Sequence, residues 1–175
     1  KAADLAELTA AGWLTPIRAF APVAPDLRNL RTRAGDYEVN ALANRATVIS
    51  GSVVEAWQRH GAGRLSIAFA VNVSHAKALA SAFRAAGIAA EAVDGSMPMA
   101  ERDAILDRLR KGKIKVAVNV GVLAAGFDLP EIGCVILARP TKSEALHVQQ
   151  VGRGLRPAPG KRNCLVIDCA GNLPR

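Results

Sequence analysis

The sequence predicts an α/β fold in which a mainly parallel sheet carries helices on both of its faces. From about residue 64 onward, short apolar runs rich in β-branched residues alternate with segments of helical periodicity. These runs are continuously apolar, which is typical of strands buried on both faces. Apolar strands separated by helices therefore indicate a doubly covered, mainly parallel sheet.

The first 63 residues have a different pattern, and we expect them to form a connector or helical lead-in that packs against the sheet. Residues 64–175 are expected to form the α/β domain itself. The lead-in should contain, in order, a helix over 2–11 that Gly12 stops, an extended proline-punctuated stretch over 15–25 and one or two helices over 37–60.

Five strands and three helices are predicted in the α/β domain. Ser74 is a candidate N-cap for the first helix, which Gly87 closes. Pro98 opens the second helix, which ends before Gly112, and the third covers about 143–152. The predicted strands cover residues 65–71, 88–93, 114–119, 134–138 and 164–168.

Composition and charge limit the class of protein. At 175 residues and 50% hydrophobic content, the chain is long enough for one domain with a real core and is not disordered. Its formal net charge of +8 suits a polyanionic partner such as nucleic acid, although a merely basic soluble protein is the alternative.

The cysteines argue against a disulfide framework and against a zinc site, so we expect no metal ligands in this chain. Cys134, Cys164 and Cys169 are an odd set without a CxxC pair, and the first two lie in apolar runs that predict buried, reduced thiols. The sequence shows neither a membrane-spanning run nor a signal peptide, so we expect a cytoplasmic protein. Because it begins at Lys1, it is expected to be a fragment or a processed product.

Two arginines, Arg153 and Arg156, follow the last predicted helix three residues apart. Residues three apart share a helix face, so both guanidinium groups can converge on one target. Guanidinium forks onto phosphate oxygens, which makes the pair a candidate clamp for a transferring phosphoryl group. Two solvated surface arginines are the alternative.

The predicted functional segments begin where strands end, at Asn72, Asp94, 119–128 and 139–143. Ligands of such sheets bind outside the carboxyl ends of the strands. We therefore expect the site on the rim formed by these loops, with the two arginines facing that rim.

Four motifs occur in a characteristic order, and together they resemble the C-terminal RecA-like domain of superfamily 2 helicases and translocases over residues 64–170. A finer resemblance, to the bacterial and phage DEAD/DEAH-type group related to XPB-like and restriction-subunit helicases, rests on Gly35-Asp36-Tyr37 and 139–143. The four motifs are Phe69–His75, the turn at Asp94–Ser96 with Glu101-Arg102, Gly121–Pro130 and Gln149–Arg156.

The last of these motifs resembles motif VI, Q-x-x-G-R-x-x-R. The resemblance implies that Gln149 and Gly152 lie near the nucleotide. It also implies that Arg153 and Arg156 are arginine fingers that reach the γ-phosphate.

Gly121–Pro130 resembles motif V, whose Gly126 and Asp128 would contact the nucleotide, Asp128 as an acceptor from ribose hydroxyls. Ala124 and Ala125 depart from the Glu or Arg of many members, which leaves only backbone contacts there. An ordinary turn is the alternative for Gly126 and Asp128. The nucleic-acid backbone would contact this loop at its start, at Asn119, Val120 and Gly121.

Phe69–His75 resembles motif IV, in which Asn72, Ser74 and the following helix N-terminus would bind a strand phosphate. A plain helix cap is the alternative for Ser74, and we expect His75 at the surface. Arg102 would brace its loop or approach nucleic acid, unless it belongs to a solvated helix face.

The sequence contains neither G-x-x-x-x-G-K-[ST] nor an Asp-Glu pair after a strand, and 154–161 lacks the glycine spacing of a phosphate loop. The resemblance therefore implies ATP with Mg²⁺ held by an N-terminal RecA-like domain that precedes Lys1, so this chain alone should be inactive. Nucleic acid is the expected partner, with DNA favoured over RNA but the choice open, and no membrane. The rival function is a nucleic-acid-binding or scaffolding module. A small-molecule enzyme is disfavoured, because no G-x-G-x-x-G follows the first strand.

Overall fold

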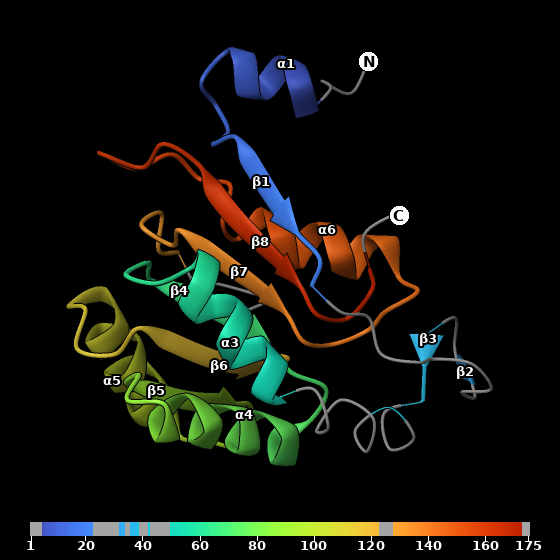
Figure 1. Ribbon diagram of the computed structural model, residues 1–175, viewed down its shortest axis with the longest axis vertical. Helices are drawn as coiled ribbons and strands as arrows, with labels where there is room; N and C mark the ends of the chain where they lie inside the picture. The colour runs from blue at the N-terminus through green and yellow to red at the C-terminus, as the bar shows by residue number, and fades with distance from the viewer. Residues whose placement is uncertain are drawn as a thin grey trace.

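A parallel six-stranded sheet forms the centre of the molecule, as expected from the sequence. The computed structural model describes residues 5–22, 32–33, 36–38, 42, 50–122 and 128–172. Within them the strand order is β1-β8-β7-β4-β6-β5, and each neighbouring pair is parallel (Figure 1). The strands are β1 (Ile17–Phe20), β4 (Ser66–Phe69), β5 (Ala90–Asp94), β6 (Val116–Val120), β7 (Cys134–Leu137) and β8 (Cys164–Asp168).

The five predicted strands all form, and the sheet gains a sixth, β1, from the lead-in. Ile17 pairs with Cys164 and Phe20 with Ile167, so β1 lies parallel to β8 at the edge of the sheet. Pro16 and Pro22 flank this strand, and Arg18 interrupts its apolar pattern. An edge strand has one partner and tolerates such residues, which is why we expected only an extended connector here.

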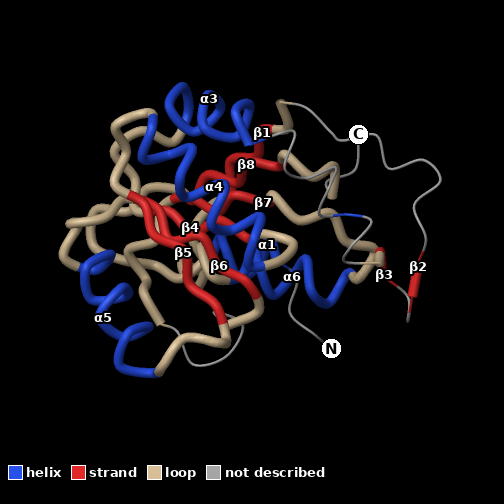
Figure 2. The backbone as a smooth tube through the Cα atoms, turned by 90° about the horizontal axis from the view of Figure 1, so that it is seen from below, coloured by secondary structure: helices blue, strands red, loops and turns tan. Residues whose placement is uncertain are grey.

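Helices cover both faces of the sheet, which confirms the predicted architecture. Helices α3 (Ser50–His60) and α4 (Val73–Ala85) pack on one face, and α5 (Met99–Arg110) and α6 (Glu144–Gly152) pack on the other (Figure 2). One core cluster gathers around Trp57 and Phe83, whose rings meet edge to face at 5.8 Å. The other gathers around Leu109 and Val151.

The first helix of the α/β domain is capped by a different residue from the one predicted. The Asn72 side chain, not that of Ser74, accepts the capping hydrogen bond, from the backbone N–H of His75 at 2.8 Å. Ser74 lies inside the first turn and is exposed. Gly87, at a φ of 78°, follows the helix as predicted.

The lead-in contains α1 (Leu5–Ala10), which ends before Gly12 as expected, and a short antiparallel pair, β2 (Thr32–Arg33) and β3 (Asp36–Tyr37).

The three cysteines are buried and free, as predicted for the first two. Burial raises the pKa of Cys134 to about 12, so this thiol stays protonated. Among the described helices, none is both long and apolar enough to cross a bilayer.

Candidate functional site

Most of the predicted nucleic-acid contacts come together at the carboxyl edge, by which we mean the loops that follow β4, β5, β6 and β7 at the ends of those strands. The loops after β5 and β6 are neighbours, because a Cβ on Gly95 would lie 3.7 Å from Val122 Cγ2. The helices α4, α5 and α6 all begin at this edge. It therefore presents several helix N-termini, which favour anions.

The turn between β4 and α4 is held by two side chains, Asn72 and His75. His75 is only 1% exposed, so the expectation of a surface histidine is wrong. Its Nδ1 accepts a hydrogen bond from the Val71 N–H at 3.2 Å. Burial lowers the pKa of His75 to about 4, so the ring is neutral near pH 7. The neutral ring can accept the Val71 hydrogen bond, which holds the turn in place.

The turn after β6 exposes backbone rather than side chain. Asn119 is buried, and its Oδ1 accepts a hydrogen bond from the Val122 N–H at 3.1 Å. Gly121 is exposed at a φ of 70°, with no atom within 4 Å of the position of a Cβ. A nucleic-acid strand that approached this turn would contact the backbone of Val120 and Gly121. Residues 123–127 of this motif, which include Ala124, Ala125 and Gly126, lie outside the described residues.

The turn after β5 is built in the same way. Asp94 is buried and accepts hydrogen bonds from Ser96, at 2.8 Å from the backbone N–H and 2.5 Å from Oγ. These bonds lower the pKa of Asp94, so its carboxylate stays ionised and braces the turn. Arg102 follows, half-buried in α5, and its Nε has no hydrogen-bond partner among the described residues.

The loop between β7 and α6 is tied to β3 through Asp36. The Asp36 carboxylate accepts hydrogen bonds from Thr141 Oγ1 at 2.9 Å and from the Lys142 N–H at 2.8 Å, and it pairs with Arg139 Nη2 at 3.3 Å. Burial raises the pKa of Asp36, but the hydrogen bonds from the Lys142 and Tyr37 backbone outweigh it and leave that pKa lowered. The two segments that carry the finer resemblance thus contact each other.

Gln149 lines a cavity under the carboxyl edge, one helical turn before Arg153. A cavity of about 30 Å³ under the edge is lined by Phe69, Asn119, Gly121, Arg139, Gln149 and Gln150, among others. Gln149, predicted near the nucleotide, therefore shares a cavity with residues predicted to contact the nucleic acid.

Arg153 and Arg156 lie at the opposite end of the sheet, so the expectation that they face the carboxyl edge is wrong. A Cβ on Gly154 would lie 2.3 Å from the sulfur of Cys164, the first residue of β8. The Thr15 N–H, just before β1, donates to the Leu155 carbonyl at 2.7 Å. The reason is length: the nine residues of α6 rise about 13 Å, as far as four residues of strand.

The arginine edge, as we call the segments 128–130 and 153–156, joins the last two motifs. Arg156 Nη1 forms an ion pair with Asp128 Oδ1, and the two side chains are 45% and 63% exposed. Arg153 is half-buried at the C-cap of α6, and Gly152 ends that helix. An exposed pair of this kind is worth about 0–1 kcal/mol, so a phosphate can replace the carboxylate at little cost.

Sequence reasoning missed four residues that shape these edges: Thr15, Asp36 as an anchor, His75 and Lys161. A signal existed for His75, which lies four residues before Leu79 and eight before Phe83, on the buried stripe of α4. The others act through contacts between distant segments.

Comparisons with known proteins identify relatives of this fold and sequence. A family model described as "Helicase conserved C-terminal domain" matches residues 51–158. The "51.5 kDa protein" of Lactococcus phage (isolate 7-9) is 35% identical over 156 residues, a match that covers 89% of the chain and 34% of the phage protein. Schizosaccharomyces pombe irc3, named provisionally as a mitochondrial ATP-dependent helicase, is 42% identical over 124 residues, covering 70% of the chain and 20% of irc3.

A solved structure shares the fold over nearly the whole chain. It is a fragment of a protein provisionally identified as the HsdR subunit of a type I restriction enzyme from Vibrio vulnificus YJ016. The TM-score is 0.73 at 23% identity, with 94% of the chain and 34% of that protein covered. The chain thus spans about a third or less of the length of the two curated relatives.

Proposed function

The chain belongs to the family of helicase conserved C-terminal domains of superfamily 2, and we propose that it is the second motor domain of an ATP-dependent helicase or translocase. The observation that carries the proposal is that the residues of the two candidate sites lie at exposed edges at the two ends of one helix. The arginine edge lies at the end of α6, and the carboxyl edge lies at its beginning.

At the arginine edge, Arg153 and Arg156 would bind the γ-phosphate of ATP held on a preceding motor domain. Their fixed charges would stabilise the charge that spreads over the phosphoryl oxygens during transfer. The donor set fits this task, because Arg156 is exposed and its present partner, Asp128, is a weakly held surface carboxylate. Bound ATP with Mg²⁺ supplies the phosphoryl chemistry, and the phosphate cradle and metal ligands would belong to that preceding domain.

At the carboxyl edge, the turns after β4 and β6 would contact the phosphates of one nucleic-acid strand. Support comes from the N-terminus of α4, where Ser74 is exposed, and from the uncovered backbone of Gly121. Contacts to phosphates do not distinguish one base from another, so binding should not depend on the nucleic-acid sequence. We propose DNA rather than RNA as the strand, because of the resemblance to restriction-subunit helicases.

Arginine substitution in the intact protein tests the proposal. Arg153→Ala and Arg156→Ala should each lower nucleic-acid-stimulated ATP turnover by about 10³-fold or more, since a finger is worth roughly 10³–10⁵ in rate. Arg162→Ala is the matched control, because it removes an exposed charge nearby. Circular dichroism should show an unchanged fold. Turnover at the wild-type rate in both finger variants would refute the assignment.

A further inference from the structure

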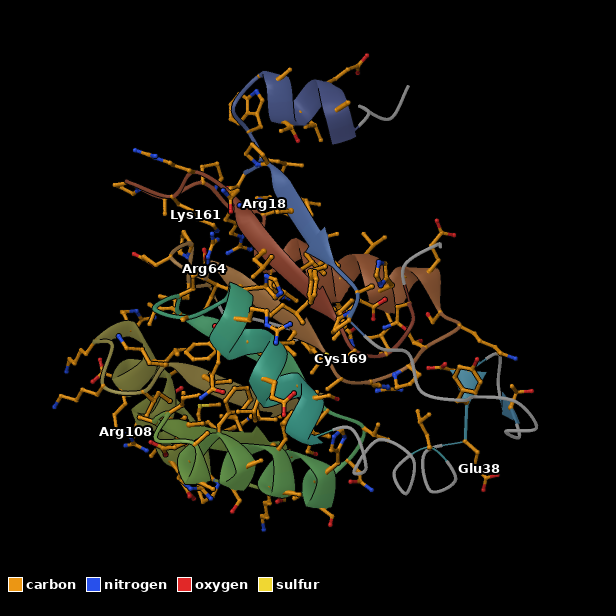
Figure 3. The ribbon with its side chains drawn as sticks, in the orientation of Figure 1. Arg18, Glu38, Arg64, Arg108, Lys161 and Cys169 are labelled. Atoms are coloured by element: carbon orange, nitrogen blue, oxygen red, sulfur yellow. The ribbon has the colours of Figure 1, made fainter. Side chains whose placement is uncertain are left out.

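The Lys161 side chain lies at the centre of the arginine edge. Its ammonium group donates three hydrogen bonds to backbone carbonyls: to Gly154 at 2.7 Å, to Arg156 at 2.8 Å and to Pro130 at 2.8 Å. Figure 3 labels Lys161 at the end of the sheet where β8 begins, on the same side as Arg64. One side chain thus joins three backbone positions on two segments.

These carbonyls belong to the two segments that form the arginine edge. Gly154 and Arg156 lie in the turn that follows α6, just beyond its C-cap at Arg153, and a carbonyl in a turn needs a donor when it is removed from water. The Lys161 ammonium supplies that donor to both of these carbonyls. Pro130 lies two residues after Asp128, whose carboxylate pairs with Arg156. The ammonium therefore joins the backbone of the turn at 154–156 to the backbone of the segment 128–130, whose Asp128 holds the Arg156 side chain.

Other contacts fix the same turn from its remaining sides. Thr15 Oγ1 donates to the Arg156 carbonyl at 3.1 Å, so this oxygen has two donors. Gly154 packs directly on Cys164 and Val135. The backbone at Arg156 is therefore immobilised, while its guanidinium remains accessible to a ligand.

We propose that Lys161 is a positioning residue, which sets the backbone of the turn at 154–156 and so aims Arg156 at the nucleotide. The inference rests on the proposed function, because its readout is ATP turnover. An ammonium suits the position: it carries three divergent N–H donors, and three carbonyls converge on it. Burial lowers the pKa of Lys161, as expected for a charge held inside a loop. Arg162, the next residue, is exposed and is the natural comparison.

The test compares four variants of the intact protein: Lys161→Met, Arg162→Ala, Arg156→Ala and the double variant Lys161→Met/Arg156→Ala. If Lys161 acts through Arg156, Lys161→Met should lower kcat by about tenfold or more and change KM for ATP by less than about twofold. Arg162→Ala should keep the wild-type kcat. The double variant should match Arg156→Ala within about twofold, because a positioning residue has no effect once the group it positions is gone.

Two results overturn the inference: a wild-type kcat for Lys161→Met, or losses that multiply in the double variant, which would indicate general destabilisation. If the Met variant does not fold, Lys161→Arg replaces it. Its planar fork keeps the charge but cannot reach all three carbonyls, so kcat should fall about threefold, and an unchanged kcat overturns the inference. A wild-type rate for Arg156→Ala would instead reject the finger assignment, and with it the role of Lys161.

Discussion

His75 makes the stability of the domain depend on pH in a window that the structure defines. The pKa of this histidine falls from its ordinary value of 6.5 to about 4 in the folded protein, because the ring is buried. Between these values the unfolded chain binds a proton that the folded chain does not. The contribution of the neutral His75 to the free energy of unfolding is therefore complete above pH 6.5 and is lost as the pH falls to about 4. The difference between the two values corresponds to about 3 kcal/mol of unfolding free energy.

Urea denaturation of the wild type and of His75→Gln, at pH values from 7 to 4, measures this contribution. The wild type should lose about 3 kcal/mol more than the variant over the window. His60→Gln, which removes an exposed histidine from α3, should follow the wild type. Equal losses in the wild type and in His75→Gln would refute the reasoning. So would an NMR titration that places the pKa of His75 above about 6.

Protonation of His75 also bears on function. A charged ring cannot accept the Val71 N–H, so the turn that Asn72 caps would lose one of its two fixing hydrogen bonds. The proposed grip on nucleic acid uses this turn.

Two further predictions concern the two edges. Gly154→Ala places a Cβ 2.3 Å from the Cys164 sulfur, so it should destabilise the domain by about 1–3 kcal/mol in thermal melts. Gly152→Ala, with open space around it, should change stability little, and equal losses would contradict the packing argument. Binding of single-stranded DNA should weaken as salt rises, with DNA bound more tightly than RNA of equal length. Salt-independent binding would contradict the proposed phosphate contacts. Tighter binding of RNA would contradict the proposal that the strand is DNA.

The strands of the α/β domain are predictable because each is a mainly apolar run, interrupted only by Glu91 in β5 and Asn119 in β6, with polar residues or turns near its ends. Strand β8 forms over the predicted residues, between Asn163 and Cys169. Strand β1 could not be predicted in this way. Arg18 and the two flanking prolines break its apolar pattern, and the segment becomes a strand only because it pairs with β8 at the edge of the sheet.

The sequence proposes the residues of the candidate site but does not give its geometry. The spacing of Arg153 and Arg156 predicts a phosphate clamp, but the end of the sheet on which the two residues lie depends on how far α6 runs back along β7. The partner of Arg156, and one of the three carbonyls around Lys161, that of Pro130, come from a segment about 30 residues away in the chain. No local pattern in the sequence reports such convergence.

Helix α6 has one further consequence for the proposed motor function. Its N-cap, Ser143, is bonded through Thr141 to the loop that Asp36 anchors, and its last turn leads into the turn at 154–156, which Lys161 bonds. A helix of nine residues behaves as a stiff rod on this scale. If the proposed function is correct, a push on the arginine end of α6 would displace the whole helix and so reach its other end, and the two proposed tasks would need no separate relay.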